Sequence, residues 1–299
     1  MPDEAPAPFR GRAFSQGSGL IGVFDSGIGG LTIVRELLRR LPGYQLIYFG
    51  DTARTPYGTK SPETIISYAI QDTEFLLEHG AKIIVVACHS ASSVATEALR
   101  ERFPWLPIFE VVTPSVKKAL AVTRKKIIGV IGTRATISSG IYQRQVARLA
   151  PEVKVYGNAC PLLVPLVEEG WLKKPETRRI VKKCLIPLKM RGIDTLVLGC
   201  THYPVLKPVI QAKAGRRVTL VDPAEEVAEE VARFLETHPK LAETLARSEE
   251  HQIYVSDLTE AFERVARLFM GRRVPLLKAD CEMSHVIKSR PGLLRERGR

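Results

Sequence analysis

The chain has 299 residues and a net charge of +12, from 44 Lys and Arg against 32 Asp and Glu, a length that suffices for about two domains. Its composition is 45% hydrophobic, 25% charged and 7% aromatic, which excludes a chain disordered throughout, a collagen-like repeat and low-complexity architecture. No apolar run approaches the roughly 18 residues of a membrane-spanning helix. The N-terminal segment lacks the apolar core of a secretory signal, so we expect a cytoplasmic protein without membrane contact.

Four segments share one design, an apolar run rich in Val, Ile and Leu that ends in small or polar residues: 20–30, 82–92, 126–136 and 194–204. Such runs, alternating with helical patterns, indicate buried parallel strands of an α/β fold. The intervening patterns predict helices over 32–41, 62–79 with Ser61 as N-cap, 93–102, 142–149 and 176–191. Further along, the pattern predicts a helix capped by Asp222 and a strand followed by a helix over 253–271.

The four strands form two pairs with similar spacing. Asp25 precedes Cys88 by 63 residues and Thr133 precedes Cys200 by 67, which indicates an internal repeat. We therefore predict an α/β fold of two similar doubly wound, mainly parallel-sheet domains, related by a pseudo-twofold axis, with the active site in the cleft between them. The expected divisions are a mobile extension over 1–19, a first domain over 20–112 plus 223–271, a second over 113–222, and a basic tail over 272–299.

The tail accounts for much of the positive charge. Residues 272–299 hold eight Lys and Arg against three Asp and Glu, and residues 1–19 are neutral, which leaves +7 for the rest of the chain. No zinc-finger spacing and no basic run interleaved with aromatic residues occurs. A basic solvated surface therefore explains the charge better than nucleic-acid binding as the main function.

The cysteines following two of the strands are the strongest candidates for chemistry. Cys88 and Cys200 each lie at an expected strand-to-helix turn, where helix amides lower the pKa of a thiol and favour the reactive thiolate. Either one alone is more readily explained as a core thiol, but their matched placement in two half-repeats favours reactivity. Cys160, Cys184 and Cys281 have no such context, so we expect them to be structural or incidental.

Asp25 ends a buried strand and precedes the glycine-rich loop 26–30. The glycines let backbone N–H groups approach an anion, although a plain capping role for Asp25 is the simpler alternative. The loop is not a dinucleotide fingerprint, because Thr32 stands where its last glycine is needed, and no phosphate-binding loop occurs. No C-x-x-C or H-x-x-x-H spacing is present either. We expect neither a cofactor nor a metal.

Several long segments resemble glutamate racemases, cofactor-independent enzymes of the aspartate/glutamate racemase superfamily. The resemblance covers about residues 20–271, and its motifs are IGVFDSGIGGLTIVRELLRRLP, IYFGDTARTPYGTKSPETI, IGVIGTRATISSGIYQR, ACPLLVPLVEEGW and GIDTLVLGCTHYPVLKPVI. It implies interconversion of L- and D-glutamate by proton transfer at Cα between two cysteines. It also implies that the product, D-glutamate, serves peptidoglycan synthesis.

The resemblance implies roles residue by residue. Cys88 acts as the base toward D-glutamate with support from Asp25, and Cys200 acts toward L-glutamate with support from His202 and Glu168. The implied substrate-binding residues are Asp25, Ser26, Pro56, Tyr57, Gly58, His89, Ser90, Thr133, Thr136, Thr201 and His202. A weakly acidic Cα–H requires such close acid and base groups and fixed donors for the carboxylates.

Two positions depart from the family pattern. His89-Ser90 replaces the usual Asn-Thr after the first cysteine, and Asp222-Pro223-Ala224 replaces Asp-Ser-Gly. His89 is either a titrating group that changes the pH dependence or a neutral imidazole that donates a hydrogen bond in place of the amide. Three further questions stay open: whether the substrate is aspartate, whether the chain is a non-catalytic binding protein, and whether it forms a homodimer.

Overall fold

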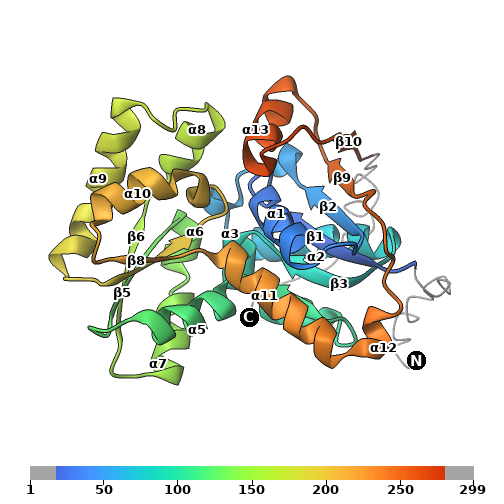
Figure 1. Cartoon of the computed structure of the whole chain (residues 1–299), viewed down its shortest axis with the longest axis horizontal. Helices are drawn as coiled ribbons and strands as arrows, with labels where there is room; N and C mark the ends of the chain where they lie inside the picture. The colour runs from blue at the N-terminus through green and yellow to red at the C-terminus, as the bar shows by residue number, and fades with distance from the viewer. Residues whose placement is uncertain (1–17, 280–299) are drawn as a thin grey trace, which may run out of the picture.

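The computed structural model describes residues 18–279 as two lobes, each built around a parallel β-sheet (Figure 1). The larger sheet has the order β10-β9-β2-β1-β3-β4. Its strands are β1 (Leu20–Asp25), β2 (Leu46–Gly50), β3 (Ala81–Val86), β4 (Ile108–Glu110), β9 (Gln252–Val255) and β10 (Leu277–Lys278). The smaller sheet has the order β6-β5-β7-β8. Its strands are β5 (Ile127–Gly132), β6 (Lys154–Ala159), β7 (Thr195–Gly199) and β8 (Thr219–Val221).

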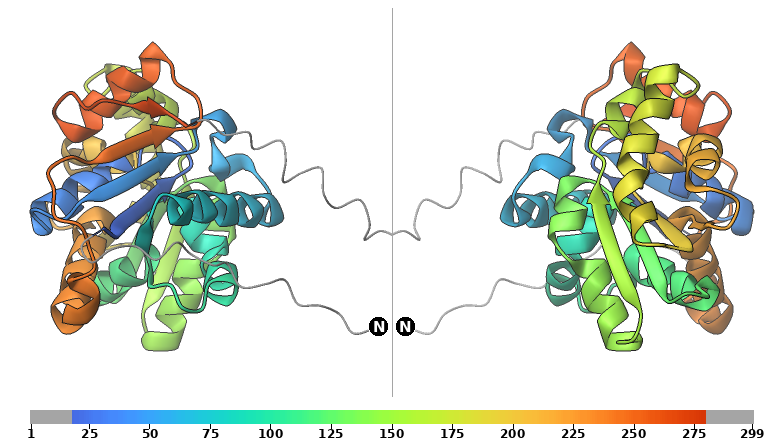
Figure 2. Two further views of the ribbon diagram at one scale, coloured as in Figure 1. Left: turned by 90° about the vertical axis from the view of Figure 1, so that its right-hand side faces the viewer. Right: turned by 90° about the vertical axis from the view of Figure 1, so that its left-hand side faces the viewer.

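Helices surround both sheets, as the two side views show (Figure 2). In chain order they are α1 (Leu31–Arg40), α2 (Pro62–Glu78), α3 (His89–Val94), α4 (Thr96–Arg102), α5 (Val112–Val122), α6 (Arg134–Ser138), α7 (Ile141–Leu149), α8 (Leu163–Glu168), α9 (Pro175–Met190), α10 (Lys207–Ala214), α11 (Pro223–Thr237), α12 (Pro239–Ala242) and α13 (Glu260–Met270). The described part of the chain also holds three short 3-10 helices: η1 (Thr52–Arg54), η2 (Tyr57–Thr59) and η3 (Tyr203–Leu206). None of the helices within 18–279 is long and apolar enough to cross a membrane.

The two sheets repeat one strand order. The order is β2-β1-β3-β4 in the first sheet and β6-β5-β7-β8 in the second, so the second strand of each set of four lies next to the first, which lies next to the third. Thus β1 corresponds to β5 and β3 to β7, as the spacing of Asp25–Cys88 and Thr133–Cys200 predicts. The predicted α/β class with two parallel sheets is confirmed, and β9 and β10 extend only the first sheet.

The predicted helix starts follow from their capping residues. The Ser61 hydroxyl accepts a hydrogen bond from the Thr64 N–H at 3.4 Å, and the Asp222 carboxylate accepts one from the Ala224 N–H at 3.0 Å. Both helices begin with proline, whose missing N–H costs nothing at that position. Both predicted caps are therefore confirmed.

The helix predicted over 93–102 starts earlier and is divided in two. Helix α3 begins at His89, directly after Cys88, and α4 begins at Thr96. The hydroxyl of Ser92 donates to the Val86 carbonyl at 2.9 Å and that of Ser93 to the His89 carbonyl at 2.6 Å. Side chains that bond back to the main chain compete with helical hydrogen bonds and bend helices, which explains the break.

The chain crosses between the lobes twice, at β4–α5 and at β8–α11. Helix α11 packs against α1 of the first lobe and against α5, and lies beside both in Figure 1. One apolar core cluster contains Val23 from β1 and Leu198 from β7, both fully buried. The lobes therefore share part of one core.

Part of the segment expected to form a tail belongs to the sheet instead. Leu277 and Lys278 pair with Tyr254 and Val255 of β9. A strand of two residues is too short to leave a hydrophobic pattern, so the sequence did not reveal it. Residues 1–17 of the expected N-terminal extension and residues 280–299 of the expected tail lie outside the described residues.

Candidate active site

Four candidate residues lie at the carboxyl ends of central strands. In the first lobe, β1 and β3 are neighbours. Strand β1 ends at Asp25, and β3 ends shortly before Cys88. In the second lobe, β5 and β7 are neighbours, and they lead to Thr133 and Cys200. Open parallel sheets bind ligands at this edge. Cys88 is 4% exposed and Cys200 5% exposed, so both thiols are shielded from bulk water.

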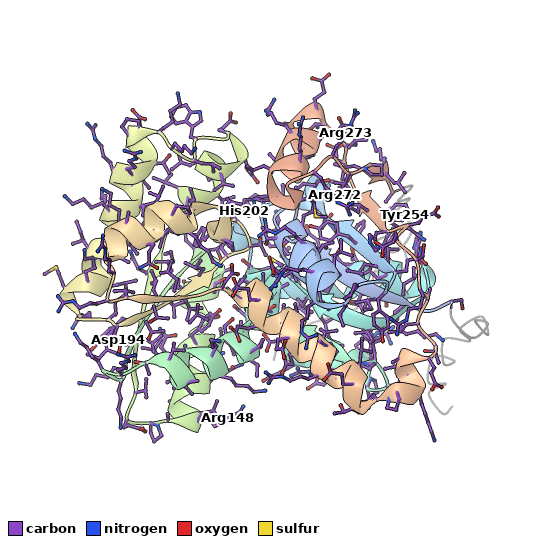
Figure 3. All side chains as sticks on the ribbon, viewed as in Figure 1. Arg148, Asp194, His202, Tyr254, Arg272 and Arg273 are labelled. Atoms are coloured by element: carbon purple, nitrogen blue, oxygen red, sulfur yellow. The ribbon has the colours of Figure 1, made fainter. Side chains whose placement is uncertain are left out.

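The loop after β1 touches the loop after β7, which brings the two edges together. A Cβ atom on Gly29 would lie 2.3 Å from Oγ1 of Thr201 and 2.5 Å from Nδ1 of His202. The Thr32 hydroxyl also donates to the Thr201 carbonyl at 3.1 Å. Only glycine permits this approach. His202 accordingly lies at the boundary between the lobes (Figure 3).

Cys88 has a buried carboxyl group as its neighbour. Oδ2 of Asp25 accepts a hydrogen bond from the Gly30 N–H at 3.0 Å, whereas its Oδ1 is buried with no partner among the described residues. Burial raises the pKa of Asp25 above its usual value. Burial, together with the charge of Asp25, raises the pKa of Cys88 to about 12. The expectation that helix amides lower the pKa is therefore wrong for Cys88, since desolvation of the thiolate outweighs them.

Cys200 has an imidazole as its neighbour. Its Sγ lies 4.0 Å from Nδ1 of His202, and Nε2 of that ring lies 3.2 Å from Oε1 of Glu168 in α8. Burial alone would lower the pKa of His202, but its interactions with Cys200 and Glu168 outweigh burial and raise the pKa to about 10. The His202 ring also packs edge-on against Phe269, with centroids 5.2 Å apart. The raised pKa favours a protonated, positively charged imidazole beside Cys200.

Hydroxyl groups from both lobes meet along the cleft. Oγ of Ser90 lies 2.9 Å from Oγ1 of Thr133, which lies 3.0 Å from Oγ1 of Thr136. A Cβ atom on Gly58 would lie 2.8 Å from Cβ of Thr133. Beside these contacts is a cavity of about 270 Å³, lined by Thr55, Pro56, Gly58, Thr59, Thr133, Arg134, Pro161, Val164, Pro165 and Glu168. Four of the residues named from the sequence thus line one cavity.

His89 is buried, and neither ring nitrogen has a hydrogen-bond partner among the described residues. Burial lowers the pKa of His89 to about 3, so the ring is neutral at physiological pH. Of the two alternatives for His89, the structure contradicts titration within the working range. The neutral ring also lacks an acceptor for its N–H among the described residues.

The Tyr57 hydroxyl is held inside the first lobe. It donates to Oδ2 of Asp72 at 2.8 Å and also contacts Asp51. Sequence reasoning missed Asp51 and Asp72, although Asp51 directly follows the buried strand β2 and Asp25 is the last residue of the buried strand β1. That shared placement is the signal that could have found Asp51.

The remaining cysteines within 18–279 take no part in the contacts described above. Cys160 is buried and Cys184 half-buried, and both are free thiols. Sγ of Cys160 donates to the carbonyl of Asn158 at 3.6 Å. Cys281 lies outside the described residues. Within 18–279, no group of three or more His, Cys, Asp and Glu side chains is arranged to hold a metal ion.

The fold and the two cysteines at facing sheet edges define a two-lobed α/β protein of the amino-acid racemase class, and comparison with known families agrees. Residues 21–231 match the family described as Asp/Glu/Hydantoin racemase, and the chain belongs to this family. A glutamate racemase of Syntrophus aciditrophicus is 47% identical over 255 residues, which is 85% of this chain and 94% of that protein.

Solved structures of the family show the same architecture. A glutamate racemase isoform from Bacillus anthracis matches with a TM-score of 0.83 and 37% identity, over 88% of this chain and 98% of that one. A glutamate racemase from Francisella tularensis, solved in complex with D-glutamate, matches with a TM-score of 0.81 and 36% identity, over 89% and 99% of the two chains. The resemblance to glutamate racemases is thereby confirmed.

Proposed function

We propose that this chain, which interconverts L- and D-glutamate like the relatives it matches, moves the α-proton of its substrate between Cys88 and Cys200 without a cofactor. One thiolate takes the proton from Cα and becomes a thiol. The other thiol gives its proton to the opposite face of the resulting carbanion and becomes a thiolate. Protons therefore balance within each turnover, and the configuration at Cα inverts.

The observation that carries this proposal is the pair of buried thiols at equivalent strand ends in two lobes that touch. Each thiol has its own ionisable neighbour, Asp25 for Cys88 and the His202–Glu168 pair for Cys200. A protein that only binds a ligand has no need for two thiols with separate acid–base partners.

The two thiols have different electrostatic surroundings. Burial and the charge of Asp25 raise the pKa of Cys88 to about 12 and favour its thiol form, whereas the raised pKa of His202 favours an imidazolium 4.0 Å from Sγ of Cys200. This arrangement suits Cys88 to donate a proton and Cys200 to take one from L-glutamate, in agreement with the roles that the resemblance assigns. In the reverse direction, Cys88 takes the proton from D-glutamate.

Unpartnered buried atoms support substrate binding in the same cleft. Oδ1 of Asp25 and both ring nitrogens of His89 are buried without partners among the described residues, and leaving such groups unpaired costs free energy. An amino acid offers an ammonium donor to Asp25 and a carboxylate acceptor to His89. Ser26, Ser90, Thr133, Thr136, Thr201 and the Pro56–Gly58 loop supply the remaining contacts in this proposal.

We further propose that the enzyme works in the cytoplasm and that its D-glutamate enters peptidoglycan synthesis, as the family resemblance implies. The two sheets also support the proposed division into domains over 20–112 plus 223–271 and over 113–222, with β10 added to the first.

The test is incubation of the purified protein in D2O with L-glutamate, and separately with L-aspartate, without any added cofactor. Optical rotation and α-deuterium are followed together. We expect rotation to fall to zero with glutamate while deuterium enters Cα. Activity that requires pyridoxal phosphate, or that is lost with a chelator, contradicts the mechanism. Faster turnover of aspartate than of glutamate contradicts the assignment of glutamate as the substrate. No turnover of either amino acid would favour a protein that only binds a ligand.

A further inference from the structure

Two carboxylates are fully buried beneath the loop that carries Pro56, Tyr57 and Gly58. Asp51 follows β2 and Asp72 lies in the middle of α2, and neither side chain is exposed. The Tyr57 hydroxyl contacts both, at 2.8 Å from Oδ2 of Asp72. Arg54 pairs with both as well, with Nε 2.5 Å from Oδ2 of Asp51 and Nη2 2.9 Å from Oδ1 of Asp72.

The Tyr57 hydroxyl and Arg54 cannot fully compensate two charged carboxylates. One hydroxyl proton serves one strong hydrogen bond, and Arg54 supplies one positive charge against two negative ones. Burial and the charge of Asp51 raise the pKa of Asp72 well above its usual value. The Tyr57 hydroxyl therefore lies between two buried acids that cannot both be charged without a cost in free energy.

The cluster fixes Tyr57 from three elements. Asp51 belongs to the sheet edge, Asp72 to α2, and Oγ of Ser256, after β9, donates to Oδ1 of Asp51 at 3.0 Å. The next residue along the loop, Gly58, lies against Thr133 of the other lobe, where an added Cβ would be 2.8 Å from Cβ of Thr133. The position of the Tyr57 ring thus determines how the first lobe meets the second along the cleft.

We propose that Asp72 is a positioning residue, which acts through the Tyr57 hydroxyl to hold the Pro56–Gly58 wall of the cleft in the geometry that binds glutamate. Burial of two carboxylates and an arginine costs free energy that an apolar core of the same volume would not. A purely structural role would be filled equally well by phenylalanine in place of Tyr57, packed on aliphatic side chains in place of the two acids. The inference rests on the proposed function, because it assigns the wall to the glutamate site.

Tyr57→Phe and Asp72→Asn test the proposal, each alone and combined. Tyr57→Phe removes the donating hydroxyl, and Asp72→Asn leaves one acceptor oxygen where Tyr57 and Arg54 each need one. We therefore expect the KM for L-glutamate to rise about tenfold, while kcat changes less than about threefold. The double variant is expected to match the singles, because both changes break the same interaction. Thr73→Val is the matched control, since Thr73 is the next residue of α2 and fully buried, and within 18–279 its hydroxyl bonds only to the Ala69 carbonyl, at 2.8 Å.

The outcomes separate the possible failures. If Thr73→Val lowers the melting temperature and leaves KM unchanged while both cluster variants raise KM, the positioning role is supported. Folded variants with wild-type KM, or a Thr73→Val variant with the same rise in KM, overturn it, as does an additive double variant. If Asp72→Asn does not fold, the KM of Tyr57→Phe decides alone. An inactive parent protein would instead refute the proposed function.

Discussion

Sγ of Cys200 lies 4.0 Å from Nδ1 of His202, whereas no imidazole nitrogen bonds to Cys88 among the described residues. The neighbour of Cys88 is the carboxyl group of Asp25, whose charge opposes a thiolate. The two halves of the fold are similar in strand order, yet they surround their thiols with opposite charge. In the proposed mechanism, this asymmetry favours proton donation by Cys88 and proton abstraction by Cys200.

The raised pKa of His202 makes stability depend on pH. Folding raises that pKa from its usual 6.5 to about 10, so the folded state binds more protons than the unfolded state between these values. The stabilisation is full below pH 6.5 and is lost as pH rises through 10. At low pH, the free energy of unfolding of the parent protein should exceed that of His202→Asn. We expect this difference to decrease by about 2–4 kcal/mol as the pH rises from 6.5 to 10. Urea denaturation at several pH values measures the difference, and a difference that is flat or rises with pH contradicts the assignment.

Replacement of either Cys88 or Cys200 by alanine is expected to abolish detectable racemisation in both directions. Each turnover uses one thiolate and one thiol, and loss of a general acid or base costs about 10²–10⁴-fold in rate. Circular dichroism with each enantiomer as substrate measures the loss. Cys160→Ala and Cys184→Ala are the controls and should retain turnover. Near-normal activity of Cys88→Ala in both directions would refute the two-base mechanism.

His89→Asn is expected to leave the shape of the pH profile unchanged. The pKa of His89 is lowered to about 3 by burial, so the ring stays neutral between about pH 5.5 and 9, far from its unperturbed pKa. The measurement is kcat/KM for glutamate across this range. Profiles that superimpose after scaling agree with the structure. A shifted acidic limb would show that substrate binding restores the charge to His89.

Much of the fold followed from the sequence because its central strands are long, apolar and buried on both faces. The strand ending at Asp25 and that preceding Cys88 are of this kind, and their spacing revealed the repeat. Short strands such as β4, β8 and β10 carry too few residues for a pattern. The contact of Gly29 with His202 and the Tyr57–Asp72 bond join residues far apart or on different elements, so no local pattern encodes them. The pKa of Cys88 was mispredicted because burial depends on the whole fold.

The end of the first sheet at β10 changes where the chain can be shortened. The Ala279 N–H donates to the Val255 carbonyl at 2.9 Å, just after the pairing of Leu277 and Lys278 with β9. Removal of residues 280–299 keeps every described helix and strand, β10 included, so we expect racemisation and melting temperature to stay close to those of the full chain. Removal from residue 272 deletes the edge strand and should lower the melting temperature by a few degrees, at about 2–4 °C per kcal/mol. Equal melting temperatures of the two truncated forms would show that β10 does not stabilise the sheet.

Gly29→Ala tests the contact between the lobes directly. The new Cβ would lie 2.3 Å from Oγ1 of Thr201 and 2.5 Å from Nδ1 of His202, closer than atoms approach, so one of these side chains must move. Because His202 is the partner of Cys200, we expect kcat to fall by about 10²-fold, the loss that a displacement of about 1 Å can cause. Gly43→Ala is the control, because its φ of +81° strains the backbone while nothing lies within 4 Å of the added Cβ. That variant should lose stability and keep its kcat. Wild-type kcat in Gly29→Ala would mean that the lobes separate enough in solution to accommodate a methyl group, and the cleft would then not depend on this contact.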